Sequence, residues 1–266
     1  YDQAIDLYDQ GDYAAARDLD EQVLEACTRV LGSEHPDTLS AKNNLAVTLR
    51  HQGDYAGARD LYEQVLEDRT RVLGPEHPDT LGTMGNLANA LRRQGDYAAA
   101  RDLDEQVLEA RTRVLGPEHP MTIGAMSDLA GALSGQGDDA GARDLYEQVL
   151  EVRVRTRGPD HPRTLGSMGV LSRVLWVQGF HAGARDLGEQ VLEAQTRVLG
   201  PEHPDTLGTM SGLAKILGDQ GDLAGAQGLR HRPHIGTGDL TVVVDTTLES
   251  YLQVIANYLG GFQNLV

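Results

Sequence analysis

Five histidines that precede proline are the residues in this sequence with the clearest chemical potential. They stand at a constant spacing of 42 residues, at His35, His77, His119, His161 and His203. Histidine is a common ligand of zinc and other metals, so the set suggests a metal site. A 42-residue spacing places the histidines in successive structural units, too far apart to share one ion. We therefore predict that they are structural residues of a linker and that the protein binds no metal.

Catalytic motifs that depend on short spacing are missing from the sequence. Serine, aspartate and histidine are all present, but no nucleophile-elbow motif and no His-Glu-x-x-His motif gathers them. No Gly-x-x-x-x-Gly-Lys-Ser/Thr run is present to bind nucleotide phosphates. The acidic residues recur with the same 42-residue period, whereas a catalytic site is expected to interrupt a repeat. We predict that the chain is not an enzyme and uses no cofactor.

Composition narrows the partners further. The formal net charge is −17, which disfavours nucleic acid and anionic membrane surfaces as partners. Cys27 is the only cysteine, so an intrachain disulfide and a cysteine-based zinc site are excluded. No apolar run approaches the roughly 18 residues that a spanning helix needs. These features agree with a cytoplasmic protein. The pattern is already under way at Tyr1, so we expect a fragment of a longer chain.

The 42-residue spacing extends over most of the sequence. A Gln-Gly-Asp tripeptide or a close variant recurs at the same interval, with its glycine at Gly11, Gly53, Gly95, Gly137, Gly179 and Gly221. A period of this length indicates a repeat protein, in which each unit buries its apolar face against its neighbours. The chain is therefore not expected to form an ordinary globular domain.

Each repeat contains two helical segments. In residues 55–73 apolar residues step by three and four, and Gly74-Pro75 then ends the helix. The other segment, which is the first helix of the next repeat, begins near Pro78, where a proline at the first helical position loses no hydrogen bond, and it ends at Gln94-Gly95. Equivalent leucines of these segments are predicted to be buried between helices, namely Leu45, Leu87, Leu129, Leu171 and Leu213.

The repeats resemble tetratricopeptide repeats, specifically the 42-residue type of kinesin light chains and their bacterial relatives. The resemblance rests on Asn44-Leu45-Ala46, on Gln52-Gly53-Asp54-Tyr55, and on the linker from Leu73 to Asp79. It covers residues 1–230, with the first repeat truncated. It implies an all-α fold, a right-handed superhelical solenoid of about six helix-turn-helix pairs. In bacteria such arrays resemble the sensor segment of larger signalling proteins with an NB-ARC-type motor.

Residues 231–266 depart from the repeat. Pro233 ends any helix there, and no lysine or arginine follows it. The tail contains a strand-like run, 241–244, and then a predicted helix in which Thr246 and Glu249 form a capping box. Its wide apolar face is expected to cap the solenoid, to fill its groove, or to join another copy of the chain.

The resemblance also implies a ligand site on the first helix of each pair, which lines the concave groove in the family. Carried onto this sequence, the site comprises Asn43, Arg50, Asn89, Arg92, Arg93, Ser127, Arg173, Trp176, Ser211 and Lys215. The basic residues among them allow two interpretations. They are either solvated helix charges or a basic strip for an acidic or carboxylate-bearing ligand.

Glycine is unusually frequent in these first helices. Ten occur between residues 78 and 220, at Gly82, Gly85, Gly124, Gly131, Gly135, Gly166, Gly169, Gly208, Gly212 and Gly218. Each costs about 0.5–1 kcal/mol of helix stability relative to alanine. Sequence drift explains such glycines, and so does a requirement for space beside a bound chain.

Together these features predict a scaffold that binds a protein or peptide, the sensor segment of a larger bacterial signalling protein. The alternative is a structural protein that forms homo-oligomers through its apolar C-terminal tail.

Overall fold

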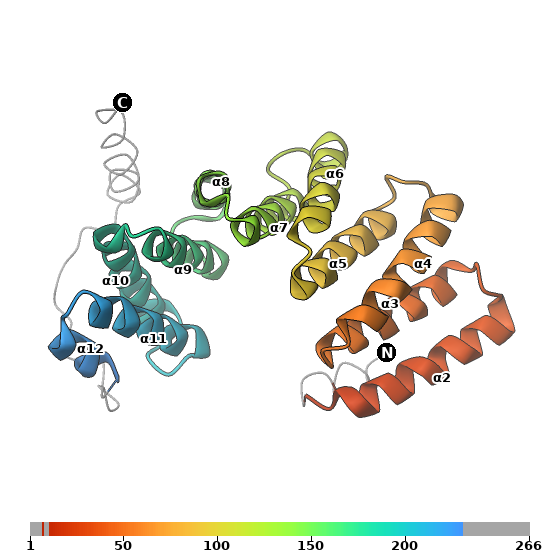
Figure 1. Ribbon diagram of the computed structural model, residues 1–266, viewed down its shortest axis with the longest axis horizontal. Helices are drawn as coiled ribbons and strands as arrows, with labels where there is room; N and C mark the ends of the chain where they lie inside the picture. The colour runs from red at the N-terminus through yellow and green to blue at the C-terminus, as the bar shows by residue number, and fades with distance from the viewer. Residues whose placement is uncertain (1–6, 8–10, 231–266) are drawn as a thin grey trace. The chain divides into compact units, whose positions relative to one another are not determined.

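The computed structural model describes residue 7 and residues 11–230. Within this part of the chain every regular element is an α-helix (Figure 1). The helices are α2 (Tyr13–Leu31), α3 (Pro36–His51), α4 (Tyr55–Leu73), α5 (Pro78–Gln94), α6 (Tyr97–Leu115), α7 (Pro120–Gln136), α8 (Asp139–Arg157), α9 (Pro162–Val177), α10 (His181–Val198), α11 (Pro204–Asp219) and α12 (Leu223–Arg230). The all-α class and the two-helix repeat predicted from the sequence are confirmed. The tail, residues 231–266, lies outside the described residues, and so do its predicted strand and helix.

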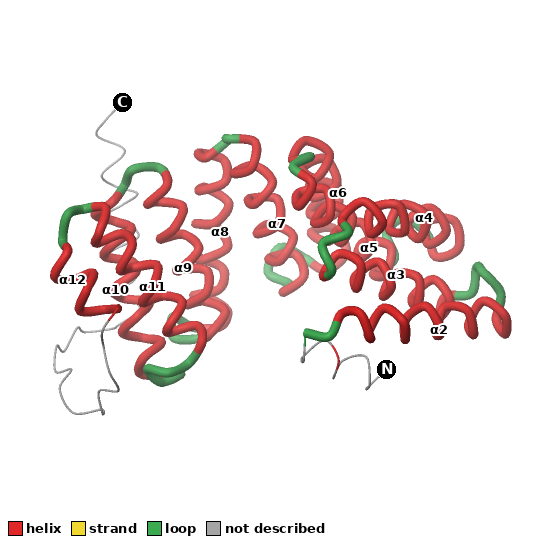
Figure 2. Tube along the Cα trace, turned by 60° about the horizontal axis from the view of Figure 1, so that its bottom comes forward, coloured by secondary structure: helices red, strands yellow, loops and turns green. Residues whose placement is uncertain are grey.

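The chain divides into two compact units, Tyr1–Leu145 and Tyr146–Val266, with the boundary inside α8. We describe each unit by itself. In unit 1 each helix from α2 to α7 packs against the next one along the chain, and in unit 2 the same holds from α9 to α12. Figure 2 shows how short loops join the successive helices. This packing of consecutive helix pairs is the arrangement that a helical repeat requires.

The second helix of a repeat begins at the aspartate of the Gln-Gly-Asp turn. At the start of α4 the Asp54 carboxylate accepts a hydrogen bond from the Gly57 amide at 2.9 Å. At the end of α4, Gly74 has φ +93° and donates its amide to the Thr70 carbonyl at 3.1 Å. A positive φ is readily adopted only by glycine, which explains why this residue ends the helix.

The first helix of a repeat begins at the histidine of the His-Pro pair. At α5 the His77 Nδ1 atom accepts a hydrogen bond from the Asp79 amide at 3.2 Å, and Pro78 occupies the first helical position. The corresponding histidines cap α3, α7, α9 and α11 in the same way. The structural role predicted for these five histidines is therefore a specific one, because each is an N-cap.

The apolar core of unit 1 lies between successive helices. Tyr62 of α4 is fully buried in it, together with small residues that allow close helix approach, such as Ala88 of α5 and Ala100 of α6. The leucines predicted to be buried in this unit are all at most 8% exposed. The interior therefore depends on Leu, Val and Ala, with tyrosine as the large residue.

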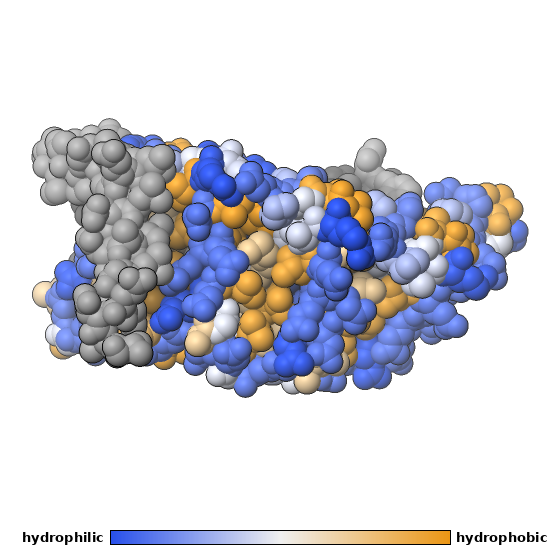
Figure 3. All heavy atoms as spheres, turned by 90° about the horizontal axis from the view of Figure 1, so that it is seen from above, coloured by the Kyte–Doolittle hydropathy of each residue, from blue (hydrophilic) through white to orange (hydrophobic). Residues whose placement is uncertain are grey.

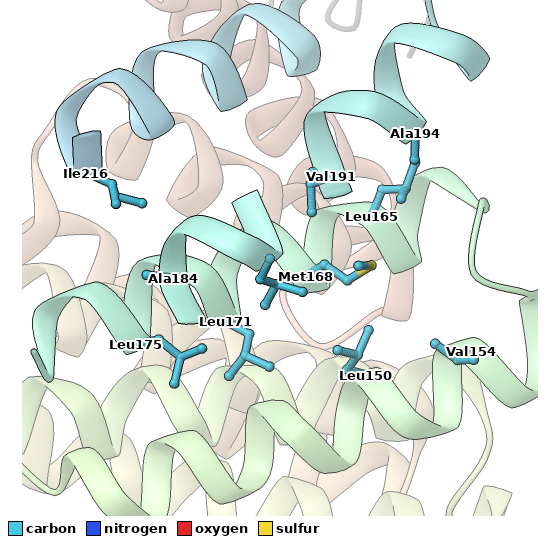
Figure 4. Packing of buried hydrophobic residues seen from close by; sticks show 11 residues of the cluster. Leu150, Val154, Leu165, Met168, Leu171, Leu175, Ala184, Val191, Ala194 and Ile216 are labelled. Carbon is cyan, nitrogen blue, oxygen red and sulfur yellow. The ribbon is translucent and has the colours of Figure 1, made fainter. Parts of the chain in front are cut away.

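Unit 2 contains two further clusters. Figure 4 shows the larger one, in which Leu165, Met168 and Leu171 of α9 face residues of α8 and α10. The smaller one joins α10, α11 and α12 through Leu192, Leu213 and Ala226. Leu171 and Leu213 are 5% and 3% exposed, so the predicted leucine row is buried in both units.

Candidate functional site

The first helices of unit 1 contact one another, α3 with α5 and α5 with α7. This arrangement brings the predicted residues of these helices onto neighbouring elements. Arg50 of α3 donates to the Asn89 Oδ1 atom of α5 at 3.3 Å. The Arg50 Nη2 atom also lies 3.2 Å from the His51 Nε2 atom, and the His51 ring stacks on Tyr13 with centroids 5.2 Å apart. Arg50 is therefore held between two helices and is not a freely solvated charge.

Arg92 is bound more tightly than Arg50. Its guanidinium donates to the Asp104 carboxylate at 2.8 Å and to the Asp128 carboxylate at 3.0 Å, which joins α5 to α6 and α7. The Arg92 and Asp104 side chains are 14% and 1% exposed. Burial raises the pKa of Asp104 to about 7, against the opposing effect of Arg92 and with a further rise from Asp128. Arg92 is thus neutralised within unit 1, and its positive charge is not available to a ligand.

The remaining predicted residues of unit 1 differ in their exposure and in their hydrogen bonds. Arg93 is exposed at the end of α5. Ser127 donates to the Ile123 carbonyl of its own helix at 3.1 Å, and Asn43 accepts from the Thr83 hydroxyl at 3.4 Å. Among the predicted cations of this unit, Arg93 is the one whose charge faces solvent.

Unit 2 brings together three side chains from the last turns of α9 and α11. The Trp176 Nε1 atom donates to the Asp219 carboxylate at 3.0 Å, and the Lys215 Nζ atom lies 4.5 Å from the centre of the Trp176 ring. The latter is a cation–π contact. Arg173 and Ser211 are exposed on the same two helices. The three side chains together form a polar, partly exposed group at the ends of these two helices.

Family comparison explains this architecture. A family model of the tetratricopeptide repeat matches residues 1–67, 37–112 and 79–153, and a second tetratricopeptide model matches residues 164–205. The chain belongs to the tetratricopeptide repeat family. Among curated proteins no significant match was found.

Solved structures place this tetratricopeptide protein beside kinesin-light-chain-like repeats. It is 30% identical to a putative kinesin light chain from Podosopora anserina with nearly identical TPR-like repeats, covering 85% of this chain and 98% of that one, with a TM-score of 0.65. BtubC from P. vanneervenii shares the fold at 18% identity, and the match covers 88% of this chain and 99% of BtubC, with a TM-score of 0.68. NprR in complex with its cognate peptide NprX matches at 16% identity over 85% of this chain and 63% of NprR, with a TM-score of 0.59.

The glycines of the tetratricopeptide first helices separate into two kinds. A methyl group added at eight of the ten would meet no atom within 4 Å, namely at Gly82, Gly85, Gly124, Gly166, Gly169, Gly208, Gly212 and Gly218. Gly135 differs, because a Cβ there would lie 2.2 Å from the Tyr97 ring. Tyr97 packing therefore accounts for Gly135, whereas the other eight leave open space along their helices.

The structure also shows cations that the sequence analysis did not include. Arg69, Arg111 and Arg153 recur every 42 residues in the second helices and reach across to the first turn of the next first helix. Arg69 is 6% exposed and donates to the Asp79 carbonyl and to the hydroxyls of Thr83 and Ser40. Burial lowers the pKa of all three. The sequence signal for these residues is the arginine that recurs every 42 residues on the second helices.

The arrangement offers hydrogen-bond donors and open space beside the helix backbone. Within residues 11–230 no group of three or more His, Cys, Asp or Glu is placed to hold a metal ion. A search of the same residues for a helix long and apolar enough to cross a membrane found none. On the face drawn in Figure 3, hydrophilic residues form bands with narrower hydrophobic strips between them.

Proposed function

We propose that this protein is a non-catalytic scaffold that binds a protein or peptide segment along the first helices of its repeats. The observation that carries the proposal is the set of eight glycines with no atom within 4 Å of an added methyl. Because glycine weakens a helix, a row of them on one kind of helix is costly unless the space is used. An extended chain lying close to the helix backbone would use it.

The polar groups beside this space favour an acidic ligand. Arg93 in unit 1 and Arg173 and Lys215 in unit 2 are exposed on the first helices, in a chain whose net charge is −17. Exposed cations on such a chain can pair with carboxylates of a partner while the surrounding charge repels other acidic surfaces. NprR, which shares the fold, was solved with a bound peptide, so the fold is compatible with this function.

Trp176 provides a direct experimental readout, because it is the only tryptophan and contacts Lys215 and Asp219. We expect short Glu- and Asp-rich peptides to change its fluorescence in a saturable titration, and peptides of reversed charge to have no effect. Lys215→Glu should weaken the affinity for acidic peptides at least tenfold, about 1.4 kcal/mol. The matched control is Arg59→Glu, which reverses the charge of a half-exposed arginine on the second helix α4 and should leave that affinity unchanged. Equal binding of both peptide classes would overturn the acidic specificity, and binding of neither would overturn the proposed function.

A second function, self-assembly, has one observation in its favour. Exposed valines recur near the C-terminal ends of second helices, with Val30, Val72, Val114 and Val198 between 41% and 74% exposed. Such residues, together with the apolar tail, would suit contacts between copies of the chain. Light scattering tests this alternative, since a mass that rises with concentration and falls after deletion of residues 236–266 would support it.

The wider context belongs to the same proposal. We place the chain in the cytoplasm, as the sensor segment of a larger bacterial signalling protein, with residues 1–230 as the repeat array and residues 231–266 as a separate tail. The net charge and the single cysteine support this assignment. Nucleic acid and membrane surfaces are not proposed as partners.

A further inference from the structure

One joint between repeats departs from the others in its charges. At the end of the second helix, leucine stands at residues 31, 73, 115 and 199, but Arg157 occupies the equivalent position of α8. At the second residue of the first helix, aspartate stands at residues 37, 79 and 205 and methionine at 121, but Arg163 occupies it in α9. Two cations therefore replace a leucine and an acidic residue at the joint where Arg153 already lies.

Arg153 fixes one side of this joint. Its guanidinium donates to the Arg163 carbonyl at 3.2 Å and to the Ser167 hydroxyl, both in the first turns of α9. Arg157 follows Arg153 by one turn of α8, so both stand on the same face of that helix, next to the first turn of α9 that carries Arg163. In agreement with this geometry, burial lowers the pKa of Arg153, and the charges of Arg163 and Arg157 lower it further. We call Arg153, Arg157 and Arg163 the arginine cluster.

Arg157 has no acceptor among the described residues. Its Nη1 atom lies 3.5 Å from the His161 Nε2 atom. However, the His161 Nδ1 atom accepts the Arg163 amide at 3.1 Å, so the neutral ring carries its proton on Nε2 and cannot accept from Arg157. The nearby Asp160 carboxylate is bound to Arg197 of α10 at 2.6 Å. The charge of Arg157 is thus left unmatched.

The equivalent arginines elsewhere have compensation that the arginine cluster lacks. The charge of Asp79 raises the pKa of Arg69, and the charges of Asp128 and Asp104 raise that of Arg111, in each case against burial. Within residues 11–230 none of the three cluster guanidiniums forms an ion pair with a carboxylate. Beside them, Gly166 leaves the start of α9 open, with no atom within 4 Å of an added Cβ.

We propose that the arginine cluster binds a phosphate group. Guanidiniums that repel one another are stabilised best by a ligand with more than one negative charge. A phosphate monoester carries about −1.5 to −2 charges and three acceptor oxygens, whereas a carboxylate carries one charge and two oxygens. The group can be free inorganic phosphate or a phosphorylated side chain of a bound peptide. This site goes beyond the acidic-peptide function proposed above and does not depend on it.

Calorimetric titration of the full chain tests the proposal, with inorganic phosphate, a phosphoserine peptide, its unphosphorylated form and its glutamate form as probes. We expect the phosphoserine peptide to bind at least tenfold more tightly than the glutamate form. Saturable binding of inorganic phosphate alone would identify a free-phosphate site. If the glutamate and phosphoserine forms both bind with the same affinity, the phosphate assignment is overturned. It is also overturned if neither inorganic phosphate nor the phosphoserine peptide binds.

Two substitutions restore residues that other repeats already carry, so they should preserve folding. Arg163→Asp and Arg157→Leu should each weaken phosphate binding at least tenfold, while Arg29→Leu, which removes an exposed arginine of α2, should have no effect. The response of Trp176 to acidic peptides should survive Arg163→Asp, which separates this proposal from the proposed function. Phosphate affinity unchanged by Arg163→Asp would overturn the site.

Introducing the cluster arginines at another joint should create a second phosphate site. Arg69 already occupies the place of Arg153, so the double variant Leu73→Arg and Asp79→Arg should reproduce the arginine cluster at the joint of α4 and α5. We expect the calorimetric stoichiometry for phosphate to rise from one to about two, with circular dichroism confirming helicity. A stoichiometry that stays at one would show that this arrangement of guanidiniums does not bind phosphate and would overturn the geometric basis of the proposal.

Discussion

The two units carry side chains of opposite character at one equivalent position of the repeat. In unit 1 the last turn of the first helix α5 carries Arg92, which pairs with the buried Asp104 of α6. In unit 2 Trp176 is equivalent to Arg92 and Gly188 is equivalent to Asp104. Trp176 packs against an apolar cluster. A Cβ at Gly188 would already lie 3.2 Å from the Leu213 side chain. Unit 1 therefore joins α5 to α6 through an ion pair at this position. In unit 2 the Trp176 ring packs against apolar residues, and its Nε1 atom donates to Asp219 of α11.

The arginines of the second helices show the same division. Arg111 in unit 1 lies near the charges of Asp128 and Asp104, whereas Arg153 in unit 2 lies near those of Arg163 and Arg157. The helix framework is the same in both places. A repeat fold therefore constrains its small and apolar positions, while polar positions at the joints are free to diverge. Those positions are where binding properties can differ between repeats.

The largest expected effect tests whether the apolar framework is shared. Leu129 in unit 1 and Leu171 in unit 2 are equivalent and are 8% and 5% exposed. Replacing either with alanine should lower the free energy of unfolding by about 2–5 kcal/mol, because the cavity cannot fully collapse. Urea titration followed by circular dichroism measures the change. A loss below about 0.5 kcal/mol at one site only would show that the two units differ in packing as well as in charge.

A second prediction concerns the ionic joint of unit 1. Burial raises the pKa of Asp104 to about 7, so the folded state binds a proton that the unfolded state has released above pH 4. The contribution of Asp104 to the free energy of unfolding is greatest below the pKa that Asp104 has in the unfolded chain, and it is lost as the pH rises through about 7. The asparagine of Asp104→Asn cannot ionise, so the variant does not lose stability in this way. Its stability relative to the natural protein should therefore increase from pH 4 to pH 8, by at most about 4 kcal/mol.

Thermal or urea unfolding of both proteins at several pH values measures this difference. Asp144→Asn, which neutralises an exposed carboxylate of α8, serves as the control and should show little pH-dependent difference. A constant difference between Asp104→Asn and the natural protein across the range would mean that Arg92 keeps Asp104 ionised throughout.

The smallest expected effects compare two glycines and differ in sign. Gly135→Ala should destabilise the protein by about 1–3 kcal/mol, because the new Cβ would collide with the Tyr97 ring. Gly169→Ala in α9 should stabilise it by about 0.5–1 kcal/mol, because its Cβ meets nothing within 4 Å. Stability by urea titration and affinity for acidic peptides should be measured together. Stabilisation of Gly169→Ala without any loss of affinity would assign that glycine to sequence drift.

The sequence predicted the helices well because their signals are local. Helices α4 and α5 begin and end where the glycine and proline signals place them, and the equivalent leucines are buried. The role of His77 as an N-cap was not foreseen, because the pattern suggested a linker residue and not the direction of Nδ1. The spacing alone predicts that this set of histidines does not bind a metal ion.

The polar site was harder to predict because charge pairing is a tertiary property. Arg50, Arg92 and Arg93 look alike in the sequence, yet Arg92 is neutralised by two carboxylates that come from other helices. Arg69, Arg111 and Arg153 were overlooked because their positions on second helices gave no indication that their side chains reach the next repeat. Residue type and periodicity identify the helix face, but only the packing shows which charges remain available.

The helix contacts that the repeats share have an evolutionary consequence. Within each unit a first helix meets the preceding and following helices through the same kinds of residue, with a histidine cap at its start and small residues in its middle. A gene can therefore gain or lose one 42-residue segment in frame without creating an unfamiliar interface. Such an event changes the number of first helices and carries along any local specialisation, including the arginines at residues 157 and 163. Recombination can thus redistribute binding properties faster than point mutation can create them.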